Sequence, residues 1–69
     1  MKAAQAAAAS IIGISSGEFI IDVAPEDHNQ ILVNWRESMK VGRDVQKRVE
    51  AAVKEALPSR YKHCRVSVT

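Results

Sequence analysis

The chain has 69 residues, a net charge of +2 and a hydrophobic fraction of 46%. A chain of this length forms one domain at most and buries only about 60% of its unfolded surface, so some help from self-association is expected. The single cysteine excludes an intrachain disulfide, and no Cys/His group has the spacing of a zinc site. We therefore expect a folded, single-domain protein over residues 1–69 that needs no metal and no cofactor.

The charge is distributed unevenly. One lysine against four acidic residues gives residues 1–35 a net charge of −3, and nine Lys/Arg against four acidic residues give residues 36–69 a net charge of +5. No apolar run is long enough to span a bilayer, and the alanine-rich start does not fit a signal peptide. A soluble, cytoplasmic protein that does not bind membranes, with its thiol kept reduced, is the expectation.

The first segment is rich in alanine, the residue with the highest helix propensity. Gly13 follows it and is typical of a helix C-terminus. We predict a helix from Ala3 to about Ile12 that covers an apolar patch of Ile20 and Leu32 or packs across a dimer. A strand through residues 11–14, with a turn at residues 15–17, is the alternative.

Residues 18–24 and 30–36 both alternate, and the turn-forming residues 25–29 separate them. This pattern predicts a β-hairpin in which Ala24 faces Gln30 across a five-residue loop. That register pairs Glu18 with Arg36 at the open end. It also gathers one apolar wall, formed by Phe19, Ile21, Val23, Ile31, Val33 and Trp35. The opposite face is polar except for a small patch of Ile20 and Leu32.

From Val41 to Leu57 the apolar residues follow a helical period, and Pro58 ends the segment. Ser38 is the predicted N-cap, and Gly42 is expected to weaken the first turn. On the charged side of this helix two pairs at i, i+4 spacing are predicted to attract each other, namely Asp44 with Arg48 and Glu50 with Lys54.

Alternation returns at Cys64, Val66 and Val68 and predicts a final strand. A strand-helix-strand connection makes this strand parallel to residues 30–36 in the same sheet, whereas its place beside the second or the first strand stays open. The predicted fold class is α+β, in the order helix, hairpin, helix, strand, with the amphipathic helix packed on one face of a small sheet.

No catalytic constellation is recognisable. His28 is expected in the solvated hairpin loop, and the neighbours His63 and Cys64 are expected on opposite faces of a strand, where they cannot form a couple. The three glycines match no phosphate-binding loop. We therefore expect a protein that is not an enzyme.

Two kinds of binding remain. The small size, a free sheet edge and a surplus of apolar residues predict a binding module that acts by protein contact. It would work as a homodimer or higher oligomer, or against a protein target, as do the small regulators and inhibitors that phages and mobile elements encode. The candidate interface consists of Ile11, Ile12, Ile14, Ile20 and Leu32.

The alternative is nucleic-acid binding through the basic second half, because clustered Lys and Arg side chains neutralise phosphates. Acidic residues are interleaved with them, as on an ordinary solvated helix face. The candidate surface consists of Arg36, Lys40, Arg43, Lys47, Arg60, Lys62 and Arg65.

Overall fold

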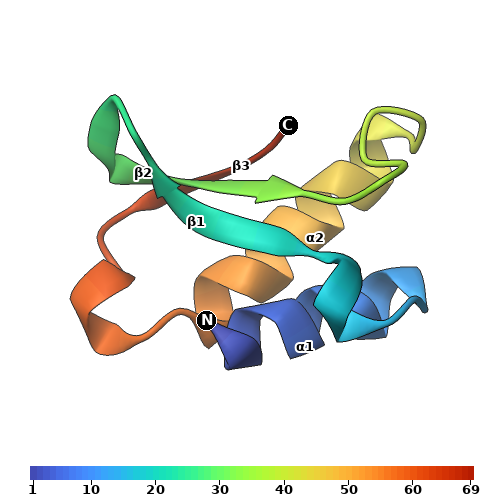
Figure 1. Ribbon diagram of the computed structural model, residues 1–69, viewed down its shortest axis with the longest axis horizontal. Coiled ribbons are helices and arrows are strands. Elements are labelled where there is room, and N and C mark those ends of the chain that lie inside the picture. Colours follow the sequence, from blue (N-terminus) through green and yellow to red (C-terminus); the bar gives the residue numbers. More distant parts are fainter.

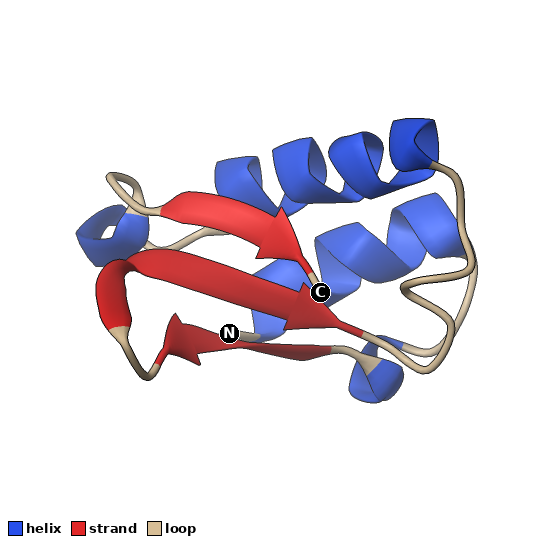
Figure 2. Cartoon of the chain, turned by 90° about the horizontal axis from the view of Figure 1, so that it is seen from above, coloured by secondary structure: helices blue, strands red, loops and turns tan.

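The structure is a computed structural model that describes residues 1–69 and forms two layers (Figure 1). Its helices and strands are α1 (Lys2–Ile12), β1 (Ile20–Ala24), β2 (Asp27–Asn34), α2 (Arg43–Ala56) and β3 (Arg65–Val68). Both helices lie on the same side of the sheet (Figure 2). The predicted α+β class and the order α-β-β-α-β are confirmed.

The hairpin has the predicted register in its central part. Val23 pairs with Ile31 and Ile21 pairs with Val33 in antiparallel β1 and β2. This register is fixed by the apolar wall, because a shift by one residue would turn every one of those side chains to solvent. Phe19 and Trp35 continue the wall beyond the strand ends, with ring centroids 5.4 Å apart.

The predicted hairpin loop is wrong. Ala24 faces Asp27 instead of Gln30, the turn contains only Pro25 and Glu26, and the register shifts between Val23 and Ala24. The turn-forming residues Asp27 to Asn29 belong to β2, and residues 28–30 are extra residues without a partner on β1. The Asp27 carboxylate accepts a hydrogen bond from the Asn29 N–H at 2.9 Å. A bulge of this kind bends a strand near the sheet margin.

The last strand settles the open question of strand order. β3 lies beside β2 and runs parallel to it, with Ile31 opposite Val66 and Val33 opposite Val68, so the order is β1-β2-β3. The parallel direction agrees with the prediction. Both β1 and β3 are therefore edge strands.

Helix α1 confirms the helical reading of the N-terminus and ends at Gly13. This glycine adopts φ 82°, in the left-handed region, and its N–H donates to the Ala9 carbonyl at 2.7 Å. An isolated alanine helix of 11 residues is barely stable in water, so packing must hold it. Ala4 and Ala8 are completely buried on the α2 side, and the Gln5 amide donates to the Phe19 carbonyl at 2.8 Å.

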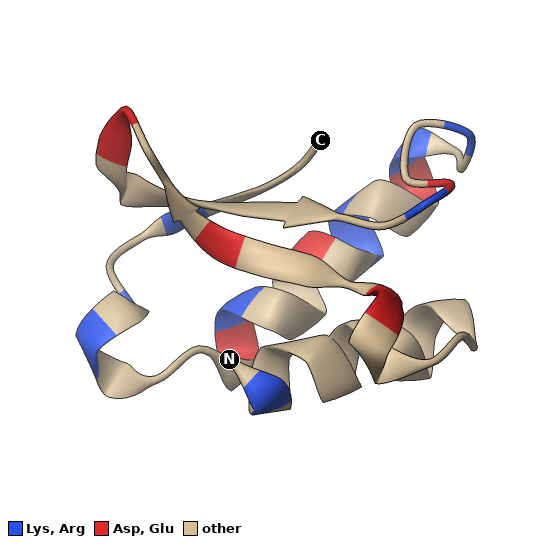
Figure 3. Ribbon diagram, in the orientation of Figure 1, with Lys and Arg blue, Asp and Glu red and all other residues tan.

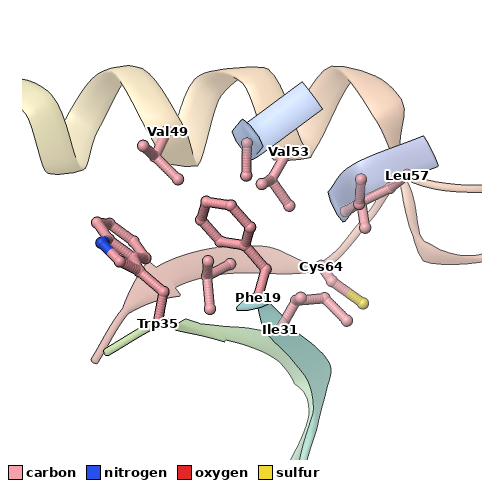
Figure 4. Packing of buried hydrophobic residues seen from close by; sticks show 10 residues of the cluster. Phe19, Ile31, Trp35, Val49, Val53, Leu57 and Cys64 are labelled. Carbon is pink, nitrogen blue, oxygen red and sulfur yellow. The ribbon is translucent and has the colours of Figure 1, made fainter. Parts of the chain in front are cut away.

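This placement of α1 corrects one expectation, because the helix packs on the same face of the sheet as α2 and leaves the Ile20 and Leu32 patch uncovered. Neither helix has the length and apolarity that a membrane crossing requires. The core between the layers is formed by ten buried residues, most of them visible in Figure 4. They are Ala4, Ala8, Phe19, Ile31, Val33, Trp35, Val49, Val53, Leu57 and Cys64.

Helix α2 begins two residues later than predicted. Gly42 is its N-cap, in an extended conformation, so the glycine lies outside the helix and does not weaken it. Ser38 is not the N-cap. It lies within the loop between β2 and α2, where its side chain is buried and its hydroxyl donates to the Thr69 carbonyl.

Ser38 is the anchor of that loop. Its own carbonyl accepts from the Gln46 amide at 2.9 Å, and its hydroxyl also lies 3.4 Å from the Asn34 amide nitrogen. We predict that Ser38→Ala lowers the free energy of unfolding by about 1–2 kcal/mol, since the Thr69 carbonyl loses one of its donors. The exposed Ser10→Ala change should lie within about 0.5 kcal/mol of the parent. Urea titration of the two variants checks this, and equal midpoints would contradict it.

Candidate functional site

The helices leave one face of the sheet uncovered. Ile20 is 68% exposed on it, and Leu32 is half-buried. Ile20 faces Asn34 and Asp22 faces Leu32, so the two aliphatic side chains are diagonal neighbours on adjacent strands. The sheet face therefore presents a small apolar patch, which we call the Ile20–Leu32 patch.

Polar side chains surround this patch, and those on its β3 side are paired with each other. The Gln30 amide donates to the Ser67 hydroxyl at 3.1 Å, and the Asn34 amide donates to the Thr69 carbonyl at 2.7 Å. On the β1 side the exposed Asp22 carboxylate has no Lys or Arg partner. The face is thus apolar in the centre and negatively charged along one margin.

The structure does not bring the five candidate interface residues together. Ile12 and Ile14 lie in the layer of the helices, packed against the core, and Ile11 is 37% exposed at the end of α1. Only Ile20 and Leu32 share the open sheet face. Their separation follows from the position of α1, because a helix on the covered side carries its isoleucines away from the patch.

Both sheet edges are partly blocked by carboxylates. The Thr69 N–H donates to the Val33 carbonyl. Backbone groups alternate in direction along a strand, so this bond and the observed registers place the N–H groups of Val23 on β1 and Val68 on β3 at the outer edges of the sheet. The Asp22 carboxylate accepts a hydrogen bond from the Val23 N–H at 2.8 Å, and the Glu50 carboxylate accepts one from the Val68 N–H at 3.0 Å. Occupied edge amides disfavour the addition of a further strand, so the sheet face is a better contact surface than its edges.

Glu50 gives a direct test of this edge protection. Glu50→Ala should lower the free energy of unfolding by about 1–2 kcal/mol, because the half-buried Val68 amide loses its acceptor. Glu55→Ala, on the exposed side of the same helix, should change it by less than about 0.5 kcal/mol. Thermal unfolding of both variants measures the difference, and an equal effect would refute the role of Glu50.

None of the three charge pairs predicted from the sequence forms an ion pair. The only ion pair joins Arg65 to Asp27 at 2.7 Å. Glu50 instead accepts from the Val68 N–H, and the Lys54 ammonium donates to the Cys64 carbonyl. Spacing along a helix did not reveal these roles, because each partner comes from β3 or the segment just before it.

The basic candidate residues divide into two groups, one at each end of α2 (Figure 3). With 14 residues at about 1.5 Å each, that helix separates Arg43 from the residues after its C-terminus by about 20 Å. In the C-terminal group the Lys62 ammonium donates to the last carbonyls of α2, and the Arg60 guanidinium lies 4.9 Å from the Tyr61 ring centroid. Arg36, Lys40, Arg43 and Lys47 form the other group, which has no ion-pair partner.

His63 and Cys64 depart from the expectation that they point apart. β3 begins only at Arg65, so strand alternation does not apply to them, and the Cys64 Sγ lies 3.7 Å from His63 Nε2. The thiol is completely buried in the core, which leaves it no access to a substrate.

His28 also differs from the prediction, since it is exposed on β2 and not in the turn. No group of three His, Cys, Asp or Glu side chains is close enough to hold a metal ion.

One hollow opens at the end of the molecule where α1 stops and the loop before α2 turns. Its volume is about 300 Å³. This hollow could not be predicted from local patterns, because its lining comes from four separate stretches of the chain. The lining residues are Ile12, Ile14, Glu18, Trp35, Arg36, Glu37 and Val41.

A scan against protein-family models and searches of the curated proteins and of the solved structures found no match to this chain.

Proposed function

We propose that the chain is a small, non-enzymatic binding module of the regulator or inhibitor type, which acts by protein contact through the open face of its sheet. The observation that carries the proposal is the one-sided layering: both helices cover one face, and Ile20 stays 68% exposed beside Leu32 on the other. An apolar patch with a polar margin is typical of surfaces that bind another protein.

The chemistry of the face describes the target. Its centre needs a small apolar surface to cover Ile20 and Leu32, and its margin needs a Lys or Arg side chain opposite Asp22, whose carboxylate faces no cation in this chain. The side-chain amides of Gln30 and Asn34 already donate hydrogen bonds within the chain, so they contribute to the shape of the surface more than to new hydrogen bonds with the target. The target is therefore a protein with an apolar contact flanked by a basic residue.

The test is capture from the native source followed by reconstitution with the purified partner. Ile20→Lys and Leu32→Lys should each weaken the reconstituted complex by at least about tenfold, because each places an ammonium in the apolar centre. Met39→Glu is the control, since Met39 is 74% exposed, as against 68% for Ile20, and lies on a different part of the surface. A complex that survives both sheet-face variants would overturn the proposal, as would one lost equally in all three.

A second function is favoured by one observation, the group of Arg36, Lys40, Arg43 and Lys47 at one end of the molecule without ion-pair partners. Four free cations on one surface suit a phosphate backbone. If this group binds nucleic acid, affinity should fall with salt with a slope of up to about −3.6 for duplex DNA. Arg43→Gln should weaken binding, whereas Arg60→Gln at the other end should not. No binding to mixed DNA or RNA at low salt would exclude this function.

A further inference from the structure

The hollow at the end of α1 contains a hydrogen-bond donor that the chain leaves unused. Trp35 is only 3% exposed, yet its indole N–H takes part in none of the side-chain hydrogen bonds. No fully enclosed side-chain nitrogen or oxygen lacks a partner, so this N–H reaches solvent. Figure 4 shows the nitrogen on the side of the ring turned away from Phe19. Trp35 is also one of the residues that line the hollow, so a group that enters the hollow comes close to this indole ring.

The rest of the lining favours an apolar occupant that carries a positive charge. Ile12, Ile14 and Val41 provide aliphatic walls. Glu18, Glu37 and Arg36 also line the hollow, and the C-terminal end of α1 adds the negative end of a helix dipole with no basic residue in its last turn. The net charge of the lining is therefore negative.

A matching group lies in the loop that forms one side of the hollow. Met39 is 74% exposed, more than the other exposed large apolar residues, and Lys40 follows it directly. Glu37 and Val41, on either side of this pair, line the hollow. The exposed methionine thus lies beside the hollow of its own chain.

The loop presents Met39 from a fixed base. Ser38 is buried and held by Thr69, Asn34 and Gln46, as described above, and two backbone turns, from Ser38 to Trp35 and from Lys40 to Glu37, close the loop. A preformed loop loses little conformational entropy on binding. A protruding side chain next to a hollow also suits a dimer with two-fold symmetry, since each copy can then insert the same side chain into the hollow of the other.

We propose that two copies of the chain associate through this end, with Met39 of each copy in the hollow of the other. Lys40 of the entering loop then meets the Glu18 and Glu37 carboxylates, and a carbonyl oxygen of that loop accepts from the Trp35 N–H. The inference goes beyond the proposed function. It concerns a surface other than the Ile20–Leu32 patch, so either can fail alone.

Sedimentation and Trp35 fluorescence between about 10 µM and about 1 mM test the contact. Trp35 is the only tryptophan, so its emission reports on the hollow. We expect a dimer whose formation shifts the emission, and Met39→Glu should raise its dissociation constant at least about tenfold by bringing a carboxylate to an acidic rim. Ile20→Lys is the matched control and should leave the dimer unchanged.

Val41→Phe tests the role of the hollow in the contact, because Val41 lines the hollow and a larger side chain at this position fills it. It should weaken the dimer as much as Met39→Glu, and the double variant should be no weaker than either single one, since both remove the same contact. The synthetic peptide of residues 36–42 should shift the Trp35 emission of Met39→Glu, which keeps its hollow. A monomer throughout the concentration range, a dimer indifferent to Met39→Glu, or a dimer without a change at Trp35 would overturn the proposal.

Discussion

Phe19→Ala is expected to have the largest effect on stability, a loss of about 3–5 kcal/mol in the free energy of unfolding. Phe19 joins the hairpin to both helices: its side chain is buried, its ring contacts Trp35, and its carbonyl accepts from Gln5 of α1. Truncation of a buried phenylalanine costs about 3–5 kcal/mol. A domain of this size has a stability of about 3–10 kcal/mol in total, so the loss amounts to about a third of it or more.

Circular dichroism during a urea titration measures this effect. The control is Ile20→Ala at the next position, where the side chain is exposed and the change should be within about 0.5 kcal/mol. A Phe19→Ala variant that keeps its midpoint within the error of the control would show that Phe19 is not in the core, and the packing of the hairpin against the helices would be wrong.

Ala8→Leu is expected to have the second largest effect, about 1–3 kcal/mol of destabilisation. Ala8 is completely buried where α1 meets α2, and α1 lies close to α2 because these contact positions are alanines. Leucine raises helix propensity hardly at all relative to alanine, so overpacking at the contact decides the sign. The helices must separate or the side chain must adopt a strained rotamer.

Ala6→Leu is the matched control, because Ala6 lies on the exposed side of the same helix. Thermal unfolding should place it near the parent and should place Ala8→Leu well below. Equal melting temperatures for the two variants would mean that α1 is not docked against α2. A stabilising Ala8→Leu would mean that the contact contains unfilled space.

Local patterns in the sequence predicted the elements well. Alternation on both sides of the hairpin fixed the register of Val23 with Ile31, because only one register keeps the apolar wall continuous. Gly13 and Pro58 marked the ends of the two helices, since each acts on the backbone at its own position. The hairpin loop was misjudged because turn-forming residues also suit a bulge within a strand.

Features that depend on distant segments could not be predicted in the same way. Ser38 resembled an N-cap by its position before α2, but its hydroxyl partner, Thr69, comes from 31 residues away. The face of the sheet that α1 covers could not be predicted, because small residues lie on every side of this helix and none marks the buried side. The hollow is assembled from four stretches, and only the fold shows that Met39 lies beside it.

Both helices cover one face of the sheet, and Ile20 and Leu32 lie on the uncovered face. Methyl NMR with a soluble paramagnetic probe tests it directly. We expect nuclear Overhauser contacts between the Ala4 and Ala8 methyls and the valines of α2, together with strong paramagnetic broadening of Ile20. Contacts from the α1 alanines to Ile20 or Leu32, with those two side chains protected from the probe, would contradict it.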